Sequence, residues 1–254
     1  MYFNLFRSAL IASALAVAVP AAADSLGFRY ADLTFGAAGA ASGPLGQVRI
    51  STDVAITGAH GLQLDLGVIG YPGEFLGQID AHLYMMPANR AKYGVYFSLA
   101  DVEGREATIA SVGVEAMFAL SANTALHGRA GIGMAMPGHL DFITASLGIN
   151  HALTKQVAIF AGMTATEIDE TSLRAVAFET HLGARYQPTG KAWEITASLV
   201  HDGLTGRDAA RFETQAELNF TLHLGAEGAE KRGLALRAFI SPQPFDPLLR
   251  RGVF

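Results

Sequence analysis

Acidic and basic residues face each other in a short, strongly patterned stretch of this sequence. In residues 111–133, SVGVEAMFALSANTALHGRAGIG, apolar residues alternate with glycine and ionisable residues on either side of Ser-Ala-Asn. Two strands joined by a three-residue loop, with Asn123 in the left-handed conformation, place Glu115 opposite Arg129. Such cross-strand pairs contribute roughly 0.2–1 kcal/mol each. The stretch therefore predicts ion pairs on one face of a sheet.

Two later hairpins offer the same kind of pair. Arg185 lies opposite Glu194 if the residues that flank the turn 187–192 pair directly. Glu217 lies opposite Arg237 in one register of the next hairpin. Only the face of each residue is forced there, because a longer loop allows the register to slide by two. The residues predicted to line an interior are Glu115, Arg129, Glu179, His181, Arg185, Glu194, Arg211, Glu213, Glu217 and Arg237.

The elements that position these residues are predicted to be strands. Alternation with a period of two recurs in thirteen patches, the last at 232–241, and indicates strands with two different faces. SVGVEA at 111 returns as SLGINH at 146 and HLGARY at 181, so one 35-residue period holds one hairpin. Many patches match the roughly 10-residue tilted strands that cross a bilayer.

The fold class predicted is therefore all-β, an antiparallel transmembrane β-barrel. Bacterial barrels have an even number of strands. Thirteen patches give about 12 strands if one terminal patch drops out, and 14 if the C-terminal tail forms a strand.

The opposite faces of the predicted strands are apolar and nearly free of charge, for example Phe178, Leu182 and Leu218. Soluble strands at a sheet edge usually carry protective charges. A membrane barrel instead turns its apolar face to lipid and its polar face to the lumen. Aromatic residues stand beside the turns on these faces and predict an interfacial girdle of Phe118, Tyr186, Trp193 and Phe220.

Residues 1–23 have the pattern of a secretory signal peptide. Arg7 precedes the apolar run 9–19, and three alanines end at Ala23, where we predict cleavage. The remaining chain has 17 basic and 23 acidic residues, a net charge of −6, which argues against a nucleic-acid-binding protein. Cysteine is absent, so disulfide bonds are excluded. The predicted organisation is signal peptide 1–23, barrel 24–241, and tail 242–254.

The signal peptide, the hairpin at 111–133 and the terminal Phe254 resemble outer-membrane β-barrel proteins of Gram-negative bacteria, the porin-like superfamily. The resemblance is a pattern that covers nearly the whole mature chain. It implies an outer-membrane location, assembly by the barrel-assembly machinery, and contact with outer-membrane lipids and lipopolysaccharide. The tail departs from it, because Pro242, Pro244 and Pro247 make a poor last strand. We expect either a short last strand or a segment in the periplasm or the lumen.

Catalytic motifs known from this architecture were not found. None of the eight histidines has a serine two residues later, the His-x-Ser spacing of outer-membrane lipid hydrolases. His201 and Asp202 resemble the His–Asp pair of omptin-type proteases only superficially, because adjacent strand residues point to opposite faces. No zinc-ligand spacing occurs. We therefore expect no enzyme activity, no metal and no cofactor.

The leading hypothesis is a small outer-membrane channel or a structural membrane protein with a charged, paired lumen. One alternative is an outer-membrane lipid-modifying hydrolase. The other is a soluble periplasmic β-barrel that binds an apolar ligand inside. The direction in which the apolar faces point distinguishes the soluble barrel from the other two.

Overall fold

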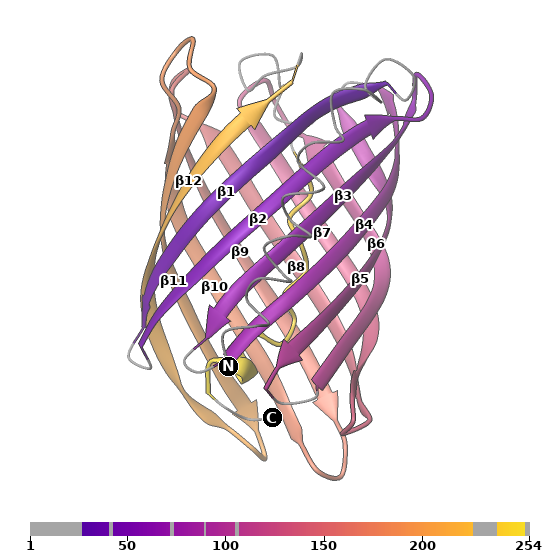
Figure 1. Ribbon diagram of the computed structural model, residues 1–254, viewed down its shortest axis with the longest axis vertical. Coiled ribbons are helices and arrows are strands. Elements are labelled where there is room, and N and C mark those ends of the chain that lie inside the picture. The colour runs from indigo at the N-terminus through magenta and orange to yellow at the C-terminus, as the bar shows by residue number, and fades with distance from the viewer. Residues whose placement is uncertain are drawn as a thin grey trace, which may run out of the picture.

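The computed structural model describes residues 27–40, 43–71, 74–88, 90–104, 107–225 and 238–251. Within these residues, twelve antiparallel strands form a closed barrel (Figure 1). Each strand pairs with its neighbours in the sequence, and β1 closes the barrel on β12. The strands are β1 (Phe28–Ala40), β2 (Gly43–Ala55), β3 (His60–Tyr71), β4 (Glu74–Ala88), β5 (Ala91–Glu103), β6 (Ala107–Ala119), β7 (Thr124–Met136), β8 (Leu140–Ala152), β9 (Val157–Asp169), β10 (Arg174–Tyr186), β11 (Trp193–Gly206) and β12 (Ala210–Leu224).

The predicted fold class and the strand number of 12 are confirmed. Each strand has 12 to 15 residues, enough for a tilted crossing of a bilayer and a short extension. The thirteenth predicted patch, 232–241, differs. Residues 232–237 lie outside the described part of the chain, and residues 238–241 form no strand. The strands of the described chain therefore end at Leu224, before the predicted barrel boundary at 241.

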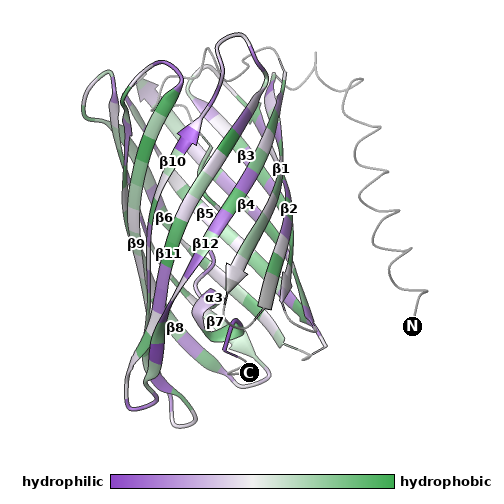
Figure 2. Ribbon diagram, turned by 90° about the vertical axis from the view of Figure 1, so that its left-hand side faces the viewer, coloured by the Kyte–Doolittle hydropathy of each residue, from purple (hydrophilic) through white to green (hydrophobic). Residues whose placement is uncertain are grey.

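The outer surface of the barrel is apolar. Leu182 and Leu218, both predicted to face outward, are 62% and 58% exposed, whereas Glu115 is only 4% exposed. Green bands of hydrophobic residues alternate with paler and purple positions along each strand in Figure 2. Soluble proteins rarely expose apolar surface on this scale, so the outer face suits hydrocarbon rather than water. The soluble barrel with an apolar interior is therefore not favoured.

The loop at Ser-Ala-Asn has the predicted length but not the predicted conformation. The backbone N–H of Leu120 donates to the carbonyl of Thr124 at 2.8 Å, which leaves residues 121–123 as the loop. Asn123, however, does not have a positive φ. Among the described non-glycine residues only His139 does, in the turn between β7 and β8. Asn123 therefore contributes no left-handed turn.

The glycines of the 35-residue repeat point into the barrel and make room for rings. A Cβ added at each glycine would lie within 2.2–2.7 Å of a ring atom on the preceding strand. Bulkier residues would therefore displace the rings. The pairs are Tyr96 over Gly113, His127 over Gly148, and Phe160 over Gly183.

The C-terminal tail lies inside the barrel. From here on the tail means residues 238–251, which run through the interior and include the short helix α3 (Asp246–Leu249), drawn in yellow in Figure 1. We name the barrel end at the turns 137–139 and 170–173 the α3 end, and the end at the turn 120–123 the SAN end. Of the predicted locations for the tail, the structure shows the lumen. No helix among the described residues is long and apolar enough to cross a membrane.

Apolar packing closes the α3 end. Phe245, Leu248 and Leu249 of the tail are at most 4% exposed. They belong to one buried cluster with inward-facing residues from many strands, among them Leu76, Ile109, Phe142, Ile168 and Leu204. The ring of Phe142 meets that of Phe245 edge-on at 4.7 Å. Apolar side chains packed around α3 thus close this end of the lumen.

Candidate functional site

The predicted pair of Glu115 and Arg129 forms in the interior. The two residues are direct partners across β6 and β7. Arg129 donates from Nη2 and Nε to Glu115 Oε2 at 2.8 and 3.2 Å. The other carboxylate oxygen of Glu115 lies 2.7 Å from Nδ1 of His82 on β4. Arg129 also donates to the carbonyl of Ile240 in the tail. This pair therefore connects two parts of the wall with the tail.

The second predicted pair forms in a different register. Arg185 is directly opposite Thr196 rather than Glu194, and Tyr186 is opposite Ile195 rather than Trp193. The register has slid by two, which preserves the face of every residue. Arg185 Nε still reaches Glu194 Oε1 at 2.9 Å across the diagonal. The ion pair between Arg185 and Glu194 forms as predicted, although the two residues are not direct cross-strand partners.

The third predicted pair involves Arg237, which lies outside the described residues. Glu217 instead lies 3.4 Å from Nη2 of Arg250, a residue of the tail. Arg211 and Glu213 are exposed near the start of β12 and line none of the interior cavities described below. The placement of these two residues in the lumen therefore lacks support, because β12 begins near the rim.

Four strands whose polar residues were not among the predicted site residues carry a buried polar network. Its members lie at alternate positions of β2, β3, β4 and β5 and are nearly inaccessible. The alternation in HGLQLDL at 60 and GQIDAHLY at 77 was the signal that could have identified many of them. They are Asp53, Gln63, Asp65, Gln78, Asp80, His82, Tyr84 and Lys92.

Two glutamines of this network hold the tail. The amide of Gln63 accepts from the backbone N–H of Phe239 and donates to the carbonyl of the same residue, each at 2.8 Å. Gln78 donates to the carbonyl of Pro242 at 2.6 Å. The Ser241 hydroxyl donates to Asp65 at 3.0 Å. The tail thus pairs with side chains of β3 and β4 much as an added strand pairs with backbone.

A second group of the network lies toward the SAN end. Tyr84 donates to Asp53 at 2.7 Å and accepts from Arg29 at 2.6 Å. The ammonium of Lys92 lies 3.6 Å from the Asp53 carboxylate. It also lies 3.9 Å from the ring centre of Tyr84 and 4.4 Å from that of Phe239. The buried charge is therefore compensated by an acid and by two aromatic faces.

At the α3 end, charged residues of the tail contact acids of both the tail and the wall. Arg250 Nε donates to Asp246 at 2.6 Å, and Tyr71 of β3 donates to the same carboxylate. Arg251 forms an ion pair with Asp202 of β11. Both arginines of the tail, Arg250 and Arg251, therefore pair with acids inside the barrel.

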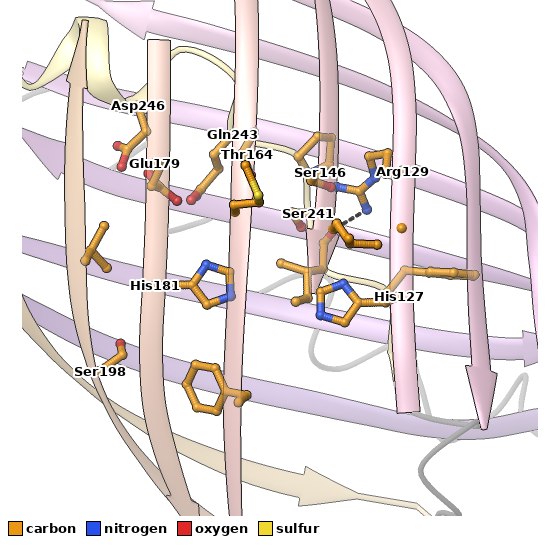
Figure 3. Close-up of a pocket in the computed structure, with 18 of the residues that line it drawn as sticks. His127, Arg129, Ser146, Thr164, Glu179, His181, Ser198, Ser241, Gln243 and Asp246 are labelled. Carbon is orange, nitrogen blue, oxygen red and sulfur yellow. Dashed lines mark hydrogen bonds between the residues drawn. The ribbon is translucent and has the colours of Figure 1, made fainter. Parts of the chain in front are cut away.

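A cavity of about 320 Å³ remains between the tail and the wall formed by β6 to β12 (Figure 3). The residues of the predicted set that line it are Glu115, Arg129, Glu179, His181, Arg185 and Glu217. A second cavity of about 200 Å³ shares Arg185 and residues 238–240 with the first, and it also contains Glu194. The tail therefore fills only part of the lumen.

Two histidines project over a pair of glycines in this wall. His127 of β7 is directly opposite Gly148, Gly148 is opposite Gly162, and Gly162 is opposite His181 of β10. A Cβ on Gly148 would lie 2.2 Å from His127, and one on Gly162 would lie 2.5 Å from His181. Among the described residues, neither imidazole has a hydrogen-bond partner. This expanse of small residues keeps the cavity open.

Three of the four predicted girdle residues lie together at the SAN end. Tyr186 and Phe220 are exposed on the outer face, and Trp193 stands between them with ring centres 6.4 and 6.1 Å away. Phe118, also exposed, lies near the end of β6 at the same end of the barrel. Their role at a membrane interface stays a prediction.

Comparisons with known proteins identify the fold. No family model matches the sequence, and no curated protein sequence matches it. Solved structures do match. A KdgM porin in complex with disordered oligogalacturonate gives a TM-score of 0.53 at 10% identity, covering 75% of this chain and 98% of that chain. A NanC porin gives 0.54 at 10% identity, covering 76% and 98%. The CymD monoaromatic hydrocarbon channel gives 0.52 at 9% identity, covering 78% and 89%. This chain has the barrel fold of outer-membrane porins.

Proposed function

We propose that this protein is an integral outer-membrane barrel that acts as a small channel for ions or small polar solutes, closed here by its own C-terminal tail. The apolar outer face supports insertion in a bilayer. The likeness in fold to proteins named as porins and channels supports the same function. The predicted signal peptide, with cleavage after Ala23, would direct export.

The observation that carries the proposal is the way in which the tail occupies the lumen. The side-chain amides of Gln63 and Gln78 hydrogen-bond to its backbone. When the tail moves, water or a solute could take the place of the tail backbone as the partner of these amides. Side chains from the strands fill the interior of a barrel of about eight strands, but the lumen of this twelve-stranded barrel is wider. Here a separate segment fills it and leaves a polar cavity along one wall.

The cavity lining favours a path for charged or polar species. It combines Arg185 and Arg250 with Glu179 and Glu217, and it adds hydroxyls such as those of Ser146 and Thr164. Rings of charge in a pore set its ion selectivity. When the tail leaves with Arg250, Glu179 and Glu217 stay on the wall, so we expect a cation preference in the open state.

Single-channel recording in planar bilayers tests the proposal. Purified full-length protein should show discrete openings separated by long closed periods, because the tail must leave its contacts before ions pass. Barrel insertion is verified separately by heat-modifiable gel migration. Correctly folded and inserted protein that never conducts, at any voltage and with the tail contacts weakened by mutation, would refute the channel.

The partners implied by an outer-membrane location stay predictions. They are the barrel-assembly machinery during insertion, and lipopolysaccharide and other outer-membrane lipids around the finished barrel. Depletion of the assembly machinery should lower the amount of heat-modifiable protein if the first prediction is right.

A further inference from the structure

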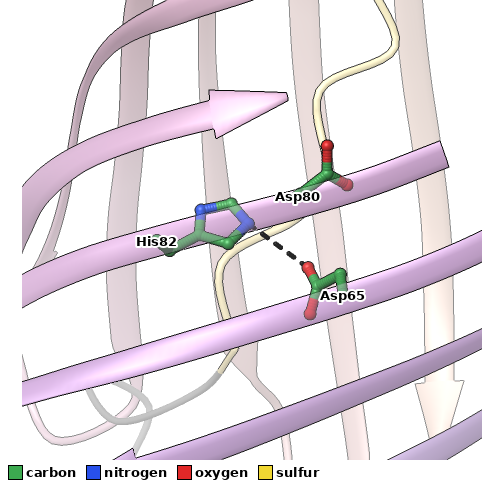
Figure 4. A group of neighbouring side chains, drawn as sticks. All are labelled: Asp65, Asp80 and His82. Atoms are coloured by element: carbon green, nitrogen blue, oxygen red, sulfur yellow. Dashed lines mark ion pairs between the residues drawn. The ribbon is translucent and has the colours of Figure 1, made fainter. Parts of the chain in front are cut away.

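Two buried aspartates oppose each other in the wall beneath the tail. Asp65 of β3 and Asp80 of β4 are direct cross-strand partners, and they are 2% and 1% exposed. Like charges directly opposite each other are destabilising. His82 follows two positions after Asp80 on the same face of β4. One ligand atom from each of these three residues lies within 4.8 Å of the others (Figure 4).

The imidazole of His82 is oriented for a ligand. Its Nδ1 lies 2.7 Å from Glu115, a carboxylate that can only accept when ionised, so the proton is assigned to Nδ1. In the neutral imidazole, Nε2 then carries the lone pair that a metal ion would bind. This atom is fully buried, has no hydrogen-bond partner among the described residues, and lies 3.3 Å from Asp65 Oδ2. A lone pair and two carboxylates therefore face one another, and a cation between them would satisfy all three.

The surrounding residues fix these three groups in place. Gln63 donates to both oxygens of Asp65 at 3.1 and 3.0 Å, and Gln78 donates to Asp80 at 2.9 Å. Glu115 is held in turn by Arg129. A histidine that binds a metal usually donates its other ring N–H to a carboxylate, and the ligating carboxylates are hydrogen-bonded themselves. Both conditions are present here.

We propose that Asp65, Asp80 and His82 bind one divalent transition-metal ion, with Glu115 orienting the imidazole. One nitrogen and two carboxylate oxygens suit Zn²⁺, and also Mn²⁺ or Fe²⁺. Ligand atoms about 2.0–2.2 Å from Zn²⁺ in a tetrahedral site lie roughly 3.3–3.6 Å from one another. His82 Nε2 and Asp65 Oδ2 already have this separation. Ser241 and Glu115 contact the site and also line the large cavity, which gives the ion a route.

The barrel contains a matched pair that lacks the second carboxylate. Asp32 of β1 is directly opposite His223 of β12, and the two side chains are 2.9 Å apart. A pair of this kind is an ordinary side-chain hydrogen bond. The Asp32–His223 pair therefore serves as the control for the three-ligand site. The metal-binding test does not depend on whether the barrel conducts.

The test is a titration with Co²⁺ of the folded full-length protein in detergent, without a tag and stripped of metal. Binding is measured by the visible absorption of bound Co²⁺ and by its displacement with Zn²⁺. We expect one bound ion per chain. Glu115→Gln should weaken binding by about 10–100-fold. Asp80→Asn, which removes a ligand, should weaken it further, and Asp32→Asn should leave it unchanged. Heat-modifiable migration confirms folding of each variant.

Two results would overturn the proposal. One is the absence of a saturable Co²⁺ spectrum in the wild-type protein, which would make His82 a protonated bridge between Asp65 and Glu115. The other is binding of equal affinity in Glu115→Gln and the wild type. If Asp80→Asn fails to fold, the Glu115→Gln variant, which keeps all three ligands, decides the question.

Discussion

Inside the barrel, the wall formed by β3 and β4 and the wall formed by β8 and β9 follow the same alternation but present different residues. The first wall carries long polar side chains inward, such as Gln63, Gln78 and His82. The second carries Gly148, Gly162 and short hydroxyl residues. The tail hydrogen-bonds to the first wall, and the cavity lies against the second. Side-chain length at inward positions therefore determines where the lumen is filled and where it is open.

The largest expected effect comes from removing the amides of the first wall. In a Gln63→Leu, Gln78→Leu double variant, three backbone groups of the tail lose their partners, and a buried unsatisfied group costs about 1–3 kcal/mol. We expect the tail to detach. Alkylation of a cysteine placed at Ser241 should accelerate by at least about 100-fold, which corresponds to 2.7 kcal/mol or more.

The matched control lies on the second wall. Thr164→Val changes an inward residue that lines the cavity without contacting the tail through a hydrogen bond. It should leave the alkylation rate of the same cysteine within about twofold of the parent, because Thr164 makes no hydrogen bond with the tail that the substitution could remove. Equal acceleration by both variants would show that the two walls do not differ in the way described.

The next effect concerns the apolar packing that closes the α3 end. Leu248 is fully buried in the cluster that holds the helix. Leu248→Ala should weaken docking of α3 by about 2–5 kcal/mol, the usual range for a buried leucine. Limited proteolysis from the C-terminus should then proceed past Arg250 in the folded barrel. A cleavage pattern identical to that of the wild type would contradict the packing.

A smaller effect tests why the second wall stays open. Gly148→Ala would bring a Cβ to 2.2 Å from the His127 ring, and we expect a loss of about 1–3 kcal/mol in stability. Gly77→Ala is the control, because nothing lies within 4 Å of its added Cβ. The urea midpoints of the two variants should differ, with only Gly148→Ala lowered. Equal midpoints would mean that the ring moves aside without cost.

Features of this molecule that depend on residues close together in the sequence are predictable, whereas features that depend on residues far apart in the sequence are not. Alternation within a strand is local, so the twelve strands and the outward position of Leu218 were predictable. The short Ser-Ala-Asn loop fixed the register that pairs Glu115 with Arg129. The longer turn 187–192 did not fix a register, and there the direct pairing slid by two.

The tail was harder to predict for the same reason. Its contacts join residues far apart in the chain, such as Gln63 with Phe239, and no periodicity encodes them. Pro242 and Pro244 ruled out a good strand but left the location open. The strands β2 to β5 were predicted, but their inward polar residues were not, because these include neutral amides, which a search for opposite charges does not detect.

The smallest expected effect is on ion selectivity. Glu217 lines the cavity from β12, and its partner Arg250 belongs to the tail, so Glu217→Gln removes a negative charge from the wall of the open pore. The reversal potential in a salt gradient should shift toward anion selectivity, because fixed charge in a pore sets the local ion balance. Asp208→Asn, in the exposed turn between β11 and β12, is the control and should leave the potential unchanged.

The most direct test of the tail as a plug uses the absence of native cysteine. Asp65 and Ser241 have side-chain oxygens 3.0 Å apart, so we expect cysteines at both positions to form a disulfide bond between the wall and the tail, which the loss of both free thiols on oxidation verifies. In planar bilayers the oxidised protein should stay closed. Addition of a reductant should restore openings, while a Ser241→Cys single variant responds to neither treatment. Unchanged conductance in the fully oxidised protein would show that ions pass with the tail in place, and the tail would then not be the gate.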